Sequence, residues 1–154
     1  MSARWRKLQR EFYLLRADNL DFQLHCSAYR MSSQYGSTDL PRYWITLKGK
    51  TIWDYPKDFI GIQHPSRENP AHYPYATDVS AISELIRDYI DTSKNVLLIK
   101  PFETDHWGLI NILRAADRRV GVRRLSELKS KTHNKAARRV IEARANQGRP
   151  NQAL

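Results

Sequence analysis

The sequence has a single cysteine, Cys26, in 154 residues, so an intramolecular disulfide is excluded. It also lacks an apolar run of the roughly 20 residues that a membrane-spanning helix needs. The first residues include Arg4, Arg6 and Lys7, where a signal peptide has an uninterrupted apolar stretch. We therefore expect a soluble cytoplasmic protein.

Motifs typical of enzymes are missing as well. The sequence contains no Gly-rich phosphate loop and no His-Glu-x-x-His or Cys-x-x-Cys spacing. Glu103, Asp105 and His106 are the best local cluster for proton transfer or metal binding, but Asp105 is equally well placed to cap a helix. Cys26 and His25 are neighbours in an expected strand and therefore point to opposite faces. The sequence predicts no catalytic residue, no metal site and no cofactor, and it disfavours an enzyme.

Acidic residues are scarce in the last part of the chain. Residues 111–154 contain twelve Arg and Lys residues against three Asp and Glu residues, a charge of +9 out of a formal net charge of +10. Residues 1–110 contain fourteen basic and thirteen acidic residues and are almost neutral. A basic region on a neutral body favours a polyanionic partner.

Four of the basic residues are arginines on either side of Gly121. Guanidinium groups bind phosphate oxygens in pairs, which lysine cannot do. We predict a phosphate-binding surface for DNA or RNA, made of Arg118, Arg119, Arg123, Arg124, Lys135, Arg138 and Arg139. The alternative is that these residues form the solvated faces of ordinary helices, partly paired with Asp117, Glu127 and Glu142.

Three short helical stretches in this region invite comparison with a helix-turn-helix motif. The polar side chains that could read bases at the start of its last helix are Thr132, His133, Asn134 and Lys135. We expect contacts to the nucleic-acid backbone rather than readout of bases. The other hypothesis is a protein-interaction module, of the immunity or adaptor type, that binds an acidic protein.

Hydrophobic periodicity in the first third of the chain predicts a helix followed by strands. Apolar residues recur at helical spacing over residues 3–16, and from Leu20 to Ala28 they alternate with polar residues. Residues 32–39 are polar and predict a loop. Aromatic and β-branched residues on both sides of Gly49 predict a hairpin over residues 42–55. Its aromatic side chains could stack on bases or fill the core and pair across strands; they are Tyr29, Tyr43, Trp44, Trp53 and Tyr55.

The rest of the chain predicts helices. Apolar stripes indicate one helix that begins near a cap at Thr77 or Asp78, one over residues 109–120, one with Val122 inward, and one over roughly 133–146. Residues 96–99 fit either a strand or a helical turn. The proline-rich connection 56–78 either has a function or wraps the sheet. We expect a single α+β domain over residues 1–147, with a small antiparallel sheet, an N-terminal helix and C-terminal helices packed on one face, and a flexible tail over 148–154.

Four segments together resemble a family of small, uncharacterised bacterial proteins. They are Trp5-Arg-Lys-Leu8, His25-Cys-Ser-Ala-Tyr-Arg30, Arg42-Tyr-Trp-Ile-Thr46 and Asp117-Arg-Arg-Val-Gly-Val-Arg-Arg-Leu125. The resemblance spans both ends of the chain. It implies a bacterial protein with one domain, and it implies no particular activity.

Overall fold

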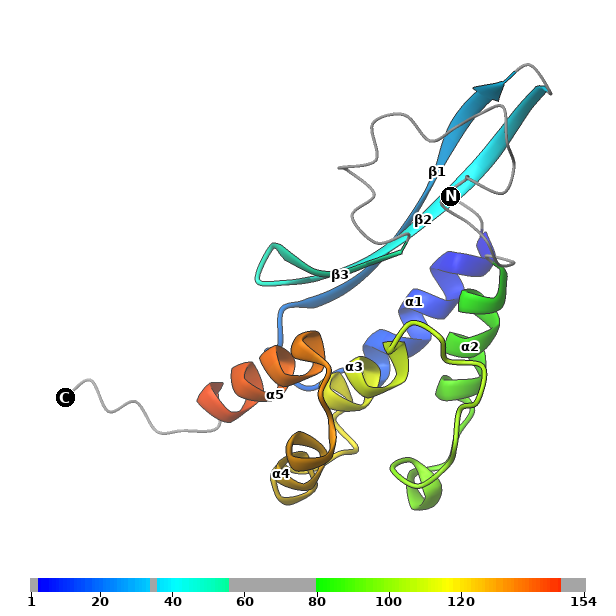
Figure 1. Cartoon of the computed structure of the whole chain (residues 1–154). Coiled ribbons are helices and arrows are strands. Elements are labelled where there is room, and N and C mark those ends of the chain that lie inside the picture. Colours follow the sequence, from blue (N-terminus) through cyan, green and yellow to red (C-terminus); the bar gives the residue numbers. More distant parts are fainter. Residues whose placement is uncertain (1–2, 34–35, 56–79, 148–154) are drawn as a thin grey trace.

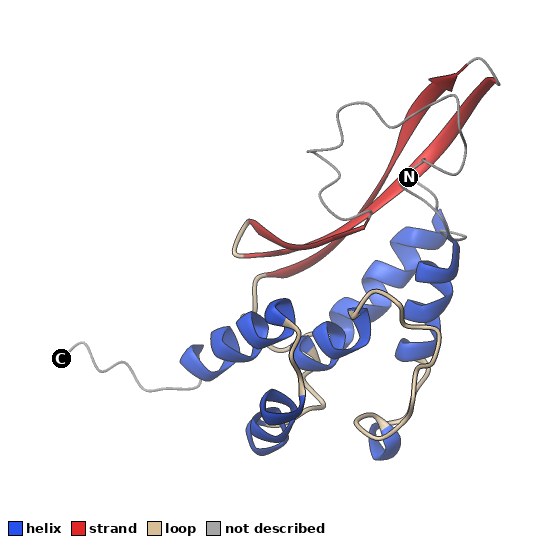
Figure 2. Ribbon diagram, viewed as in Figure 1, coloured by secondary structure: helices blue, strands red, loops and turns tan. Residues whose placement is uncertain are grey.

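A three-stranded sheet and a layer of helices make up the protein, as expected for an α+β fold (Figures 1 and 2). The computed structural model describes residues 3–33, 36–55 and 80–147. The elements are α1 (Ala3–Leu15), β1 (Phe22–Ser33), β2 (Gly36–Leu47), β3 (Lys50–Tyr55), α2 (Ser80–Ile90), the 3-10 helix η3 (Lys94–Val96), α3 (Leu109–Ala116), α4 (Val122–Lys131) and α5 (Lys135–Gln147). In Figure 1 the helices all lie on one side of the sheet.

The sheet is antiparallel in the order β1-β2-β3. The predicted hairpin is confirmed: β2 and β3 are joined by Lys48 and Gly49, whose φ angles of 51° and 79° are those of a two-residue turn that matches the strand twist. The predicted loop over residues 32–39 is wrong at both ends, because β1 extends to Ser33, β2 begins at Gly36, and these two residues pair. Pairing with a neighbouring strand, rather than local preference, makes these polar residues extended.

The core lies between the sheet and the helices. On α1 the predicted stripe is buried, with Trp5, Leu8 and Phe12 at 4%, 2% and 0% exposure. The ring of Phe12 packs against Phe22 of β1 and Tyr89 of α2, at centroid distances of 5.8 and 6.2 Å. This packing holds α1 and α2 against the sheet, and α3 adds an almost fully buried apolar helix beside them.

Several helix boundaries differ from the sequence predictions. The helix expected over 109–120 ends at Ala116, because Asp117 adopts an extended conformation. Of residues 96–99, for which a strand or a helical turn was expected, Val96 ends the 3-10 helix and 97–99 are turns, so they form no strand. Val122 was expected to point inward and is 70% exposed. The connection 56–78, with the caps expected at Thr77 or Asp78, and the tail 148–154 lie outside the described residues.

Candidate functional site

The late arginine-rich segment is organised around a buried carboxylate. Asp117 is 0% exposed, and its Oδ2 accepts a hydrogen bond of 2.6 Å from the Tyr89 hydroxyl. Arg119 donates to the same carboxylate from Nη2 at 2.8 Å and from Nε at 3.1 Å. The remaining Nη1 of Arg119 donates to the Thr92 carbonyl at 2.9 Å. The Arg119 side chain is thus bound to groups of the protein itself. For Arg119 this fits the alternative prediction, in which some of the basic residues pair with Asp117.

The backbone next to Asp117 joins α1, α3 and α5. The amide of Arg118 donates to the Leu15 carbonyl at 2.6 Å, and the amide of Ala17 donates to the Ala116 carbonyl at 2.8 Å. Arg144 of α5 donates to three carbonyls at 2.9–3.0 Å, those of Ala115, Asp117 and Val120. We call Tyr89, Asp117, Arg119 and Arg144 the Asp117 junction. Since α3 ends here, Arg144 satisfies carbonyls that the helix itself leaves open.

Tyr89 of this junction makes the stability of the protein depend on pH in the alkaline range. Burial, followed by the negative charge of Asp117, raises the pKa of Tyr89 well above its usual value of about 10. In the unfolded chain Tyr89 loses its proton near pH 10, whereas the folded protein keeps it. The stability that Tyr89 contributes is therefore fully present below about pH 10 and is lost as the pH rises through the folded pKa.

We expect Tyr89→Phe to lose less stability than the native protein between about pH 9 and 11, because phenylalanine has no proton to lose. Urea unfolding at a series of pH values measures this. Tyr13→Phe is the comparison: burial raises the pKa of Tyr13 as well, but no buried carboxylate adds to it, so this replacement should change the pH dependence less than Tyr89→Phe does. Equal pH dependence in native protein and Tyr89→Phe would contradict the assignment.

Five of the seven predicted phosphate-binding residues have side chains available to a partner. Arg118, Arg123, Lys135 and Arg139 are exposed and Arg124 is half-buried. Among residues 3–33, 36–55 and 80–147, none of these five side chains has a hydrogen-bond or ion-pair partner. They can therefore meet an external anion without breaking an internal contact.

Arg138 is the second of the seven that is engaged internally. Its Nη1 donates to the carbonyls of Lys129 and Thr132 at 3.3 and 3.2 Å. The sequence placed Arg138 with Lys135 and Arg139 on the outer side of the last helix, and for Arg138 that placement is wrong. The last carbonyls of α4 lack partners within their own helix, and Arg138 lies close enough to bind them.

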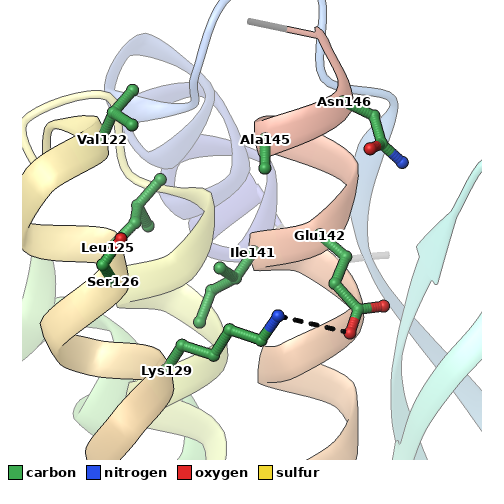
Figure 3. Close-up of a pocket in the computed structure, with 8 residues that line it drawn as sticks. All are labelled: Val122, Leu125, Ser126, Lys129, Ile141, Glu142, Ala145 and Asn146. Carbon is green, nitrogen blue, oxygen red and sulfur yellow. Dashed lines mark ion pairs between the residues drawn. The ribbon is translucent and has the colours of Figure 1, made fainter. Parts of the chain in front are cut away.

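The five available cations form two groups rather than one cradle. Figure 3 shows that α4 and α5 run antiparallel: Val122 at the start of α4 lies level with Ala145 near the end of α5, and further along Lys129 pairs with Glu142 at 3.8 Å. Arg123 and Arg124 are at the start of α4, close to Arg118 in the chain. Lys135 and Arg139 begin α5, beyond the other end of α4. The ten residues of α4 separate the groups by about 15 Å.

The residues that could read bases are partly used by the fold. Thr132 is 3% exposed. Asn134 accepts a hydrogen bond from the Ala137 amide at 3.1 Å, which caps α5, and donates to the Gly108 carbonyl at 2.6 Å. His133 and Lys135 stay exposed. This arrangement does not suit a recognition helix.

Most aromatic residues of the hairpin belong to the core or pair across strands. Tyr43 is 6% exposed, Trp53 donates from Nε1 to the Trp107 carbonyl at 2.9 Å, and the Tyr55 ring contacts Trp107 at 5.6 Å. Trp44 stacks on His25 across β1 and β2 at 4.8 Å.

The guanidinium of Arg42 also lies over the Trp44 ring at 4.4 Å, and Arg42 pairs with Asp54 at 2.8 and 3.0 Å. Burial and the charge of Arg42 lower the pKa of His25. The side chain of Tyr29 lies outside the described residues. Because Trp44 already stacks on His25 and Arg42, the sheet presents no open stacking platform among the described aromatic residues.

The cluster around Asp105 is a helix cap. The Asp105 carboxylate accepts hydrogen bonds from the amides of Leu109 and Ile110 at 3.0 and 2.9 Å, so it caps the first turn of α3 as predicted, although Gly108 is the residue directly before the helix. Cys26 is half-buried, and burial raises the pKa of its thiol, which makes it a poorer nucleophile. Within the described part of the chain no three His, Cys, Asp or Glu residues are grouped to hold a metal ion.

Sequence reasoning missed an open groove between α4 and α5 (Figure 3). The groove has a volume of about 430 Å³ and is lined by Val122, Leu125, Ser126, Lys129, Ile141, Glu142, Ala145 and Asn146. Lys129 reaches toward Glu142, as the dashed line in Figure 3 marks. The apolar spacing of both helices was visible in the sequence, but that spacing also fits a closed contact. Only the packing of the two helices leaves the groove open.

In a comparison with protein families, the model described as the SF0329 protein family matches residues 4–145. Comparisons with curated proteins and with solved structures gave no match. Among the described helices, none is long and apolar enough to cross a membrane.

Proposed function

The chain belongs to the SF0329 protein family, and we propose that it is a non-catalytic nucleic-acid-binding or regulatory accessory protein that contacts phosphates through exposed cations. The observation that supports this most is the set of five cations without an internal partner among the described residues: Arg118, Arg123, Arg124, Lys135 and Arg139. Arg119 and Arg138 drop out of the surface predicted from sequence, because the fold uses both.

The placement of these cations favours a polymer over a small phosphorylated ligand. Two groups about 15 Å apart cannot grip one phosphate together. A nucleic-acid backbone presents a negative charge about every 3.4 Å along each strand, so it can meet both groups at once. Since the residues at the start of α5 serve the fold, contacts to the backbone explain the surface better than base readout.

Fluorescence anisotropy with labelled single- and double-stranded DNA and RNA at about 50 and 200 mM salt tests this proposal. We expect binding that weakens steeply with salt. Replacing the five cations by alanine should reduce the slope of log K against log salt by about 0.7–0.9 for each phosphate contact that is lost.

A matched control removes the same charge elsewhere. Alanine at five other exposed cations keeps the net charge equal to that of the test variant; these are Lys7, Arg10, Lys48, Lys50 and Lys94. The control should retain most of the binding. If no nucleic acid binds near physiological salt, or if both variants lose binding equally, the proposed surface is wrong.

An acidic protein partner is the second candidate function. The observation that favours it is the apolar groove between α4 and α5, which a nucleic acid does not require.

A further inference from the structure

We propose that the groove between α4 and α5 binds an amphipathic helical segment of a partner protein, whose aliphatic side chains are flanked by Asp or Glu. None of the five phosphate-contacting cations lines the groove, although Arg123, Lys135 and Arg139 stand near it. The inference therefore goes beyond the proposed nucleic-acid binding and gives the second candidate function, an acidic protein partner, a binding site. Nucleic acid and an acidic partner would compete for these three cations.

The apolar half of the groove's lining suits aliphatic side chains. Leu125 and Ile141 form its floor at 3% and 4% exposure, and Val122 stands at one end at 70% exposure. Burying such surface is worth about 25 cal/mol for each Å² removed from water. No aromatic residue lines the groove, so it offers bases nothing to stack on. A groove between two helices, with apolar side chains from both, suits a third helix with apolar anchors at helical spacing.

The charges around the groove select an acidic partner. Arg123 follows Val122 at the start of α4. On α5, Lys135 and Arg139 precede Glu142 at spacings of seven and three residues, which places them on the same side of the helix as Glu142. Lys129 and Glu142 compensate each other within the groove. Unpaired cations therefore stand near both ends of an apolar channel and are complementary to carboxylates on either side of an apolar stripe.

A second copy of the chain fits the groove less well. The protein has a formal net charge of +10, and two copies joined through α4 and α5 would bring the same cations together. Like charges across an interface oppose association. The observations therefore favour a different, acidic chain.

The probe is a synthetic peptide of about three helical turns, with Leu at positions i, i+4 and i+7 and Glu on both sides of them. Isotope-labelled full-length protein is titrated with it and followed by amide chemical shifts near physiological salt. We expect the largest shifts at Val122, Leu125, Ser126, Lys129 and Ile141. Peptides with Ser in place of Leu, or with Lys in place of Glu, should bind at least about tenfold more weakly, since each lacks one half of the recognition.

Two variants with the same change in charge provide the control. Val122→Glu puts a carboxylate on the lining of the groove. Ile99→Glu puts a carboxylate at an aliphatic side chain with 74% exposure that does not line the groove. Both sites are exposed, so the fold should persist. Val122→Glu should weaken binding of the acidic peptide by about tenfold or more, because the carboxylate meets like charge and apolar side chains. Ile99→Glu should leave it unchanged.

Four outcomes would overturn the inference. Equal binding of the Ser peptide would show attraction by charge alone, and shifts confined to other elements would place the peptide elsewhere. Val122→Glu that loses DNA or RNA but keeps the peptide would assign the groove to nucleic acid. Shifts of the same residues with protein concentration alone would indicate self-association. The Ser peptide and Val122→Glu change the apolar half of the recognition and leave the five cations in place, so their results fail or succeed separately from the nucleic-acid measurement.

Discussion

Replacement of Asp117 by Ala is expected to lower the free energy of unfolding by about 3–5 kcal/mol, the usual loss when a buried ion pair is deprived of one partner. The carboxylate is 0% exposed and is the acceptor for Tyr89 and for Arg119. Without it, the Tyr89 hydroxyl and the Arg119 guanidinium lose their partner in a place that water reaches poorly. Both groups then carry an uncompensated cost of burial.

Urea unfolding followed by tryptophan fluorescence measures this loss. Glu127→Ala is the matched control, because Glu127 is an exposed acid on α4 and its removal should change stability by less than about 0.5 kcal/mol. A loss of less than about 1 kcal/mol in Asp117→Ala would contradict the central role of this carboxylate, since it would resemble an ordinary surface substitution.

Arg144→Met is expected to cost about 2–3 kcal/mol, in the range reported for hydrogen bonds to charged groups. Methionine keeps the apolar stem but loses the donors to the carbonyls of Ala115, Asp117 and Val120. Burial lowers the pKa of Arg144, although the group stays charged at neutral pH. The guanidinium therefore lies at the C-terminal end of α3, where it donates to the carbonyls and its positive charge is stabilised by the negative end of the helix dipole.

The same urea measurement tests Arg144→Met against Arg139→Met. Arg139 is on the same helix but is exposed and has no side-chain partner among the described residues. Arg139→Met should leave stability nearly unchanged and should weaken nucleic-acid binding instead. If the two variants are equally stable, the three hydrogen bonds of Arg144 contribute nothing measurable.

Both predictions divide the late arginine-rich segment into two roles. The side chains of Asp117, Arg119 and Arg144 tie α2, α3 and α5 together, whereas the side chains of Arg118 and Arg123 are exposed. Stability and polyanion binding should therefore respond to different arginines. A scan of the arginines that measures both properties would separate the two sets.

The local pattern of the chain determined most of its elements. The stripe of Trp5, Leu8 and Phe12 made α1 recognisable, and Gly49 between aromatic and β-branched residues made the β2–β3 hairpin recognisable. Asp105 was identified as a cap because its short carboxylate reaches nearby backbone amides. These features depend on residues close in sequence, and the α+β class follows from their order.

The use of each cation was decided by the tertiary structure. Sequence alone treats Arg118 and Arg119 alike, but the first is exposed and the second is bound to Asp117 and to the Thr92 carbonyl, 27 residues away. Arg144 likewise binds carbonyls more than 20 residues earlier. The sequence determined the net charge of +10. Which cations stay available to a partner, and whether a groove opens between α4 and α5, depend on contacts between distant segments. A guanidinium binds whichever acceptor the fold brings within about 3 Å, and no local pattern specifies that acceptor.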